Sequence, residues 1–195
     1  MGAIGDLIAG LSAAIEDLVM ASVGLPYLLL IVAAVCLVDA VFPVVPSESV
    51  LIAVATVSVS SAAGGATGVA ASAAGGASGP PLWALVLVAA AAAWIGDHLV
   101  FHLGRRVGAE RWAWLRRPRV ARAVEWARRA LARRGGLYIV TGRFIPGGRV
   151  AVNFVAGSTR YPRGRFAVTA GLAALIWASY SVGIGVFFGA VFDGQ

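Results

Sequence analysis

Long and nearly unbroken apolar runs dominate the chain, and little of it shows the alternating or three-to-four spacing of a half-buried soluble element. Such runs indicate helices that have lipid as their solvent. Two of them, 82–104 and 166–192, are long enough to cross a membrane, and the second is rich in small residues that suit close helix packing. The pattern predicts an all-α membrane protein that forms a single domain over residues 1–195.

A third apolar segment, 25–59, is interrupted near its middle. Asp39 lies close to the end of its first run, and Pro43, Pro46 and Glu48 follow before or at the start of the second. Prolines remove backbone hydrogen bonds and bend helices. We therefore expect a re-entrant hairpin of two helical arms, which is stable at membrane depth only where protein or a water-filled cavity surrounds the broken backbone.

A fourth segment, 137–158, is broken in a similar way. Arg143 and Arg149 flank a turn sequence that contains Pro146 and Gly147. Each broken segment precedes a full span, which is the pattern of an inverted-repeat transporter whose site lies where the repeats meet. We expect two opposed re-entrant hairpins, one entering the membrane from each face.

The remaining segments connect these elements. Residues 1–24 carry one apolar stripe at helical spacing, which predicts an amphipathic N-terminal helix. Residues 60–81 are almost entirely Gly, Ala and Ser, which predicts a flexible loop. Residues 105–136 form a basic connection, in which we expect a helix that begins at Pro118 and ends at Gly135.

Charge is scarce and uneven. Only 13% of the 195 residues are charged and 59% are hydrophobic, whereas a soluble domain carries about 25% charged residues. The net charge is +7, no Lys or Arg precedes Arg105, and most of the arginines fall between Arg105 and Arg134. A basic protein can bind nucleic acid, but these arginines join membrane segments, so the positive-inside rule places the 105–136 connection in the cytoplasm. Cys36 is the only cysteine, which excludes an intrachain disulfide.

Two carboxylates are candidates for proton coupling. Asp39 and Glu48 lie in or beside apolar arms. A carboxylate there either pairs with a cation or takes up a proton, and both behaviours suit a transporter. The alternative is that each caps the hairpin turn at the membrane interface.

Two arginines are candidates for binding phosphate. Arg143 and Arg149 lie at the turn of the second broken segment. A guanidinium stays charged and binds phosphate in a bidentate fork, and free N–H groups gather where a helix is broken. The alternative is that both side chains reach towards cytoplasmic headgroups.

His98 and His102 are four residues apart beside Asp97, but a third metal ligand and a Glu base at helical spacing are missing. No Ser-His-Asp arrangement or nucleophile-elbow motif is present either. We therefore expect no metal, no cofactor and no enzymatic activity.

Three motifs follow one another along the chain. The first is Asp39 with Pro43, Pro46 and Glu48; the second is Gly96 and Asp97 with Phe101, Gly104 and Arg105; the third is Arg143 with Pro146, Gly147, Arg149 and Gly157. In this order they resemble the motifs of the DedA family, whose members are also called SNARE-associated or VTT-domain membrane proteins. Phe166 and Trp177 also fall where that family has a Phe and a Trp, so the resemblance covers roughly residues 25–190.

The resemblance implies a fold of two opposed re-entrant hairpins with spanning helices, in a bacterial-type inner membrane. It implies Asp39 and Glu48 as the membrane acids tied to proton coupling, and Arg143 and Arg149 as the essential arginines. The sequence departs from the family where Phe101 replaces a Tyr, where alanines replace the usual glycines after the first motif, and where the loop after residue 60 is longer than usual.

The family is associated with moving lipids between leaflets, so the expected function is transport of a phosphate-bearing lipid, such as undecaprenyl phosphate or a phospholipid, coupled to protons. The expected partners are membrane lipids and protons, with no nucleic acid. Whether the chain forms a homo-oligomer is left open by the sequence. Two alternatives also stay open: a proton- or cation-coupled transporter of small ions, and a membrane scaffold whose buried charges only fix helix packing.

Overall fold

The computed structural model describes residues 10, 13–14, 17–18, 27–42, 47–60, 80–111, 118–145 and 147–192, without the side chains of residues 60, 108–111, 118–127 and 192. Most of the expected N-terminal helix and of the 60–81 loop therefore lies outside the described residues. Pro43, Pro46 and Pro146 lie outside them as well. The described segments are helical and contain no strand, which confirms the all-α prediction.

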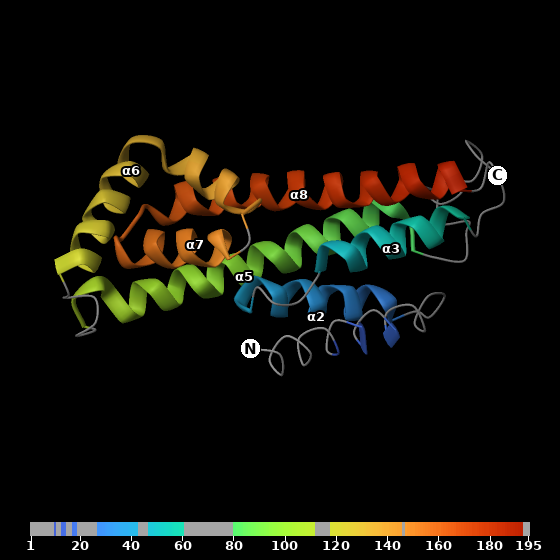
Figure 1. Ribbon diagram of the computed structural model, residues 1–195, viewed down its shortest axis with the longest axis horizontal. Helices are drawn as coiled ribbons and strands as arrows, with labels where there is room; N and C mark the ends of the chain where they lie inside the picture. The colour runs from blue at the N-terminus through green and yellow to red at the C-terminus, as the bar shows by residue number, and fades with distance from the viewer. Residues whose placement is uncertain are drawn as a thin grey trace.

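The helices differ greatly in length. Their bounds are α2 (Leu28–Val41), α3 (Ser47–Ser60), α5 (Leu82–Arg111), α6 (Pro118–Gly142), α7 (Gly148–Ser158) and α8 (Arg163–Phe192) (Figure 1). In these apolar stretches the backbone satisfies its hydrogen bonds within the helix, which is the only solution for a single segment in lipid. Helix α6 begins at Pro118, as expected, because proline suits the first position of a helix.

The two long helices, α5 and α8, have 30 residues each and are about 45 Å long at 1.5 Å per residue, which exceeds the roughly 30 Å of a bilayer core. Within the described residues these are the two helices long and apolar enough to cross a membrane. Helix α5 starts at Leu82, as predicted, but extends beyond residue 104 to Arg111, because Gly104 alone does not end a helix. Helix α8 starts at Arg163, three residues earlier than predicted, directly after Pro162.

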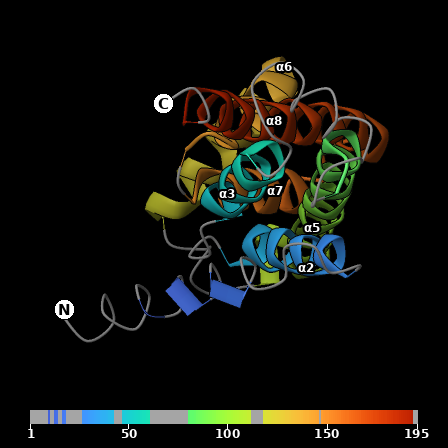
Figure 2. The same ribbon diagram turned by 90° about the vertical axis from the view of Figure 1, so that its right-hand side faces the viewer.

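The shorter helices form two pairs that run in opposite senses (Figure 1). The chain runs along α2 towards the middle of the molecule and returns along α3. It reaches the middle again at the end of α6 and returns along α7 in the other direction. Figures 1 and 2 together show α3 and α7 lying end to end along the long axis, with their N-terminal ends in the middle.

The second pair is divided from the basic connection by a kink. Arg134 has non-helical dihedrals (φ −142°, ψ 39°) inside α6, next to the predicted helix end at Gly135. The turn after α6 contains Gly147 at φ 71°, a left-handed conformation that glycine adopts without steric cost. Segment 137–158 is therefore divided into two helical pieces, the apolar end of α6 and α7.

Two apolar clusters fill the interior. The larger joins α2, α3, the first half of α5 and the middle of α8, and the smaller joins the second half of α5 to α6, α7 and the start of α8. The outer faces of both long helices are also apolar, with Trp83, Leu99, Val168 and Phe187 all more than half exposed. Large apolar residues on the outside are what contact with lipid requires.

Three of the expected motif glycines lie where helices approach closely. A Cβ atom at Gly96 would collide with Ala40 of α2, one at Gly104 with the backbone of Phe154, and one at Gly157 with the backbone of Phe101. Gly104 and Gly157 thus sit on the two sides of one contact between α5 and α7. The second and third sequence motifs are therefore joined by direct backbone packing.

Candidate functional site

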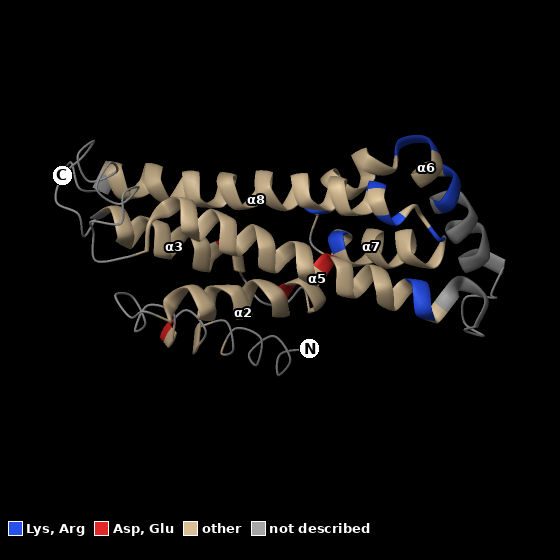
Figure 3. Ribbon diagram, turned by 180° about the vertical axis from the view of Figure 1, so that it is seen from behind, with Lys and Arg blue, Asp and Glu red and all other residues tan. Residues whose placement is uncertain are grey.

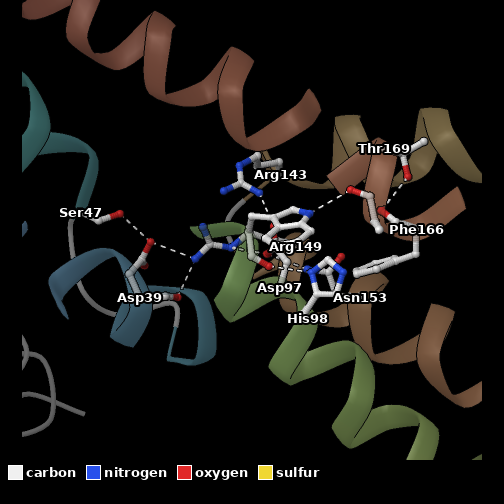
Figure 4. Close-up of polar contacts among 11 residues, drawn as sticks. Asp39, Ser47, Asp97, His98, Arg143, Arg149, Asn153, Phe166 and Thr169 are labelled. Atoms are coloured by element: carbon white, nitrogen blue, oxygen red, sulfur yellow. Dashed lines mark hydrogen bonds and ion pairs between the residues drawn. The ribbon is translucent and has the colours of Figure 1, made fainter. Parts of the chain in front are cut away.

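A buried polar cluster separates the two apolar clusters, and Asp97 is at its centre (Figure 4). Asp97 lies midway along α5 and is only 1% exposed. Its Oδ2 accepts a hydrogen bond from Nη1 of Arg143 at 2.5 Å, and its Oδ1 accepts one from Nδ2 of Asn153 at 2.8 Å. Asp97 therefore ties α5 to both arms of the second helix pair.

Arg149 connects this centre to the first helix pair. Its Nη2 donates to Oδ2 of Asp39 at 2.9 Å and to the backbone carbonyl of Asp39 at 2.6 Å. Its Nε lies 3.9 Å from Oδ1 of Asp97. Because Asp39 is in the last turn of α2, where carbonyl groups lack an intrahelical donor, Arg149 caps this helix as well as pairing with its acid.

Asp39 has a second partner on the other arm of its own pair. Ser47, the first residue of α3, donates its hydroxyl hydrogen to Oδ2 of Asp39 at 2.6 Å. Both residues are buried. The start of α3, the end of α2 and the start of α7 therefore meet at one carboxylate.

Arg143 is buried in a different way from Arg149. Its side chain is 2% exposed, and its guanidinium carbon lies 5.2 Å from the ring centroid of Trp177, midway along α8. Only Nη1 is used by Asp97; neither Nε nor Nη2 has a hydrogen-bond partner among the described residues. Arg143 therefore keeps two nitrogen donors, Nε and Nη2, without an acceptor among the described residues.

Burial of two aspartates and two arginines is costly unless each charge is compensated. Two acids and two bases balance in formal charge, and each acid is within hydrogen-bond distance of at least one base. Removing one member of such a buried pair typically costs about 3–5 kcal/mol, whereas replacing the pair by apolar residues is often neutral. Ionisable groups at membrane depth are retained mainly where they serve function.

The structure thus brings three of the four predicted site residues, Asp39, Arg143 and Arg149, into one cluster. Asp97 was expected only as a motif residue and is the central acid. The signal that could have found it is an acid inside a spanning segment, the same signal that singled out Asp39. Asn153, Ser47 and Trp177 had no assigned role, because only the fold shows that their side chains reach the cluster.

Glu48 does not join the cluster. It lies in the first turn of α3, its side chain is exposed, and it makes no ion pair with the described residues. A carboxylate in a first helical turn is favoured by the helix dipole. This position fits the alternative that Glu48 caps the turn at the start of α3. Its expected role in proton coupling stays a prediction.

The other motif residues hold elements in place. Nη1 of Arg105 donates to the carbonyl of Tyr161 at 3.2 Å and fixes the connection between α7 and α8. Nδ1 of His98 lies 2.8 Å from the carbonyl of Trp94, and its ring packs edge-on against Phe166. Among the described residues no group of three or more His, Cys, Asp or Glu side chains could hold a metal ion.

The VTT domain matches residues 45–187 of the chain, which is most of its length. The chain belongs to the VTT-domain family. This is the domain of the DedA or SNARE-associated proteins, so the resemblance seen in the sequence motifs is confirmed. Membership of this membrane-associated family, together with two helices of spanning length, identifies a membrane protein.

The matched region of the VTT domain includes Asp97, Arg143 and Arg149, whereas Asp39 precedes it. The central acid and both arginines therefore belong to the part of the chain that defines the family. No curated protein and no solved structure matches the chain.

Proposed function

We propose that this VTT-domain protein moves a phosphate-bearing lipid between the two leaflets of a membrane. The observation that carries the proposal is the buried network in which Arg149 joins Asp39 to Asp97 and Asp97 holds Arg143. This network lies midway along both long helices, where a transporter built from repeats has its binding site. No covalent step is part of the proposal.

The surface supports a placement in the membrane. Arginines gather at the α6 end of the molecule (Figure 3), among them the exposed Arg128, Arg129, Arg133 and Arg134. The positive-inside rule assigns this end to the cytoplasmic side of a bacterial-type inner membrane. The α6–α7 pair then enters from the cytoplasmic face and the α2–α3 pair from the opposite face, as two re-entrant hairpins whose tips meet at the network.

The contact between Arg149 and Asp39 is the proposed gate, because it links the tips of the two helix pairs. Protonation of Asp39 removes its negative charge and weakens the bond from Arg149. The tip of α2 and the start of α7 are then free to separate, which opens a polar path for a headgroup while the acyl or isoprenoid chain stays in lipid. Proton uptake at Asp39 would in this way be coupled to movement of the headgroup.

Leaflet transfer in vesicles tests the proposal. The full chain is reconstituted with a fluorescent phosphatidylethanolamine or a labelled polyprenyl phosphate, and label accessible to an external quencher is followed with time. We expect transfer by the wild-type protein and at least a tenfold loss in Arg149→Gln, which leaves Asp39 buried without its cation. Asp39→Asn removes the same charge as protonation does, so it should keep transfer but lose the dependence of transfer on a proton gradient. Arg133→Gln, which removes an exposed charge from α6, is the matched control and retains transfer.

A second candidate is a proton- or cation-coupled transporter of small ions. The hydrogen bond from Ser47 to Asp39 favours it, since a hydroxyl next to a buried carboxylate is a step in a proton path. Vesicles loaded with a pH-sensitive dye separate the two functions. Proton flux without lipid transfer, lost in Asp39→Asn but kept in Arg143→Gln, would support the second candidate and exclude the first. Absence of both activities would leave the network with a purely structural role.

A further inference from the structure

The two arginines of the network differ in how many of their nitrogen donors already have an acceptor. Nη2 of Arg149 donates to both the carboxylate and the backbone carbonyl of Asp39, and its Nε faces Asp97. Arg143 gives only Nη1 to Asp97, while Nε and Nη2 have no partner among the described residues. A buried donor without a partner is costly, so these two nitrogen atoms mark a position where an acceptor belongs.

The free side of Arg143 faces the start of α3. Figure 4 shows one nitrogen of its guanidinium joined to Asp97, while the group as a whole is directed to the side on which Ser47 and the start of α3 lie. The face of Trp177 covers the guanidinium from α8. An acceptor at the two unpartnered nitrogens would therefore lie between α3 and α8.

Two helix N-termini converge on the same region. Helices α3 and α7 lie end to end with their starts in the middle (Figures 1 and 2), and Ser47 and Arg149, from the first turns of each, meet at Asp39. Each helix start carries roughly half a positive charge. The arginines and aspartates of the network balance in formal charge, and the ends of α2 and α6 in the same region carry the opposite partial charge, so the start of α3 contributes locally, where it lies next to Arg143, rather than through the net charge of the region.

Ser181 supplies a further unpartnered group. It is completely buried on α8, one turn beyond Trp177 on the same face, and its Oγ has no hydrogen-bond partner among the described residues. Helices α3 and α8 run in the same direction and pack with Gly185 beside Ile52 and Gly189 beside Thr56. The same register places Ser181 beside the first turn of α3.

We propose that Arg143, the first turn of α3 and Ser181 form a buried subsite for a phosphate group, and that Arg149 holds this subsite closed without binding the phosphate. The inference rests on the proposed lipid transport and divides the roles of its two arginines. Phosphate fits because it accepts several hydrogen bonds and suits both a guanidinium and a helix N-terminus.

Binding to the purified full chain in detergent tests the subsite with three probes: farnesyl phosphate, inorganic phosphate and farnesol. Two double variants with unchanged net charge are compared, Arg143→Gln/Asp97→Asn and Arg149→Gln/Asp39→Asn. Each removes two of the three ion pairs, since the pair between Arg149 and Asp97 is lost in both, but only the first removes the unpartnered donors. We expect farnesyl phosphate to bind the wild type and to bind the Arg143 double variant at least tenfold more weakly, while the Arg149 double variant stays within about threefold of the wild type.

Ser181→Ala should weaken binding of farnesyl phosphate about three- to tenfold, because a hydrogen bond to a charged group is lost. Ser58→Ala is its matched control, since Ser58 is equally buried in α3 but donates to the carbonyl of Val54 at 2.7 Å. Thermal unfolding of every variant verifies that it is folded.

Equal weakening in both double variants, or equal binding of farnesol and farnesyl phosphate, would overturn the subsite. Inorganic phosphate that binds as tightly as farnesyl phosphate, with the same dependence on Arg143, would support the subsite and identify free phosphate as its ligand. Leaflet transfer that persists where binding is lost would contradict the proposed function but not the subsite.

Discussion

Arg149 holds the last turn of α2 twice, once through the carboxylate of Asp39 and once through its backbone carbonyl. These residues are 110 positions apart in the chain, and each lies at the tip of a different helix pair. The contact therefore fixes how the two pairs meet. A side chain that only balanced the charge of Asp39 would not also cap its helix.

Arg149→Lys should therefore not preserve function, although the charge remains. An ammonium is a compact donor on a flexible stem and does not reproduce the planar guanidinium, whose Nη2 reaches the carboxylate and the backbone carbonyl of Asp39 while its Nε faces Asp97. We expect leaflet transfer to fall at least tenfold and thermal stability to decrease. Arg133→Lys on the exposed face of α6 is the control, and equal behaviour of the two variants would contradict the argument.

Asp97→Asn should be among the most damaging single changes in the chain. It leaves Arg143 buried without a counter-ion, at a cost of about 3–5 kcal/mol in the free energy of unfolding. Glu48→Gln, which changes an exposed acid outside the cluster, should stay within about 0.5 kcal/mol. Unfolding monitored by circular dichroism in detergent measures both, and a small effect of Asp97→Asn would mean that Arg143 finds another partner.

Much of this architecture follows from the sequence, because lipid restricts a chain to few solutions. Long apolar runs predicted the helices, and the prolines and glycines predicted where 25–59 and 137–158 break. Helix ends were less accurate: α5 extends to Arg111 because no residue between 104 and 111 stops a helix.

The site was predictable only in part. Charges inside apolar segments identified Asp39, Arg143 and Arg149, but pairing depends on which helices pack together. Asp97 lies in a segment whose pattern predicts a simple spanning helix. Only the packing of α5 against α7 and against the turn after α6 shows that it faces both arginines. Ser181 gave no sequence signal for the same reason, and Trp177 was noted only as a position where the family has a Trp.

Gly104→Ala tests the close contact between α5 and α7. A methyl group at this position would collide with the backbone of Phe154, which cannot move like a side chain. We expect a loss of about 1–3 kcal/mol in the free energy of unfolding, as for other overpacked sites. Gly183→Ala on α8 is the matched control: nothing lies within 4 Å of its added methyl group, so it should be neutral or slightly stabilising.

Trp177 should stabilise Arg143 through its aromatic face rather than through volume alone. Its ring centroid lies 5.2 Å from the guanidinium carbon, in a buried position where a cation–π contact is worth up to about 2 kcal/mol. Trp177→Phe keeps an aromatic face and should keep most transfer activity, whereas Trp177→Leu removes the face and should reduce both transfer and stability.

Trp83→Leu is the control for this pair, because Trp83 is 61% exposed on the outer face of α5. Transfer rates and melting temperatures of the three variants are compared in the same vesicles and detergent. If Phe and Leu at position 177 behave alike, the ring contributes packing only, and the charge of Arg143 is balanced by Asp97 without help from α8. If Trp177→Phe keeps the transfer rate and melting temperature that Trp177→Leu loses, the middle of α8 belongs to the charged network.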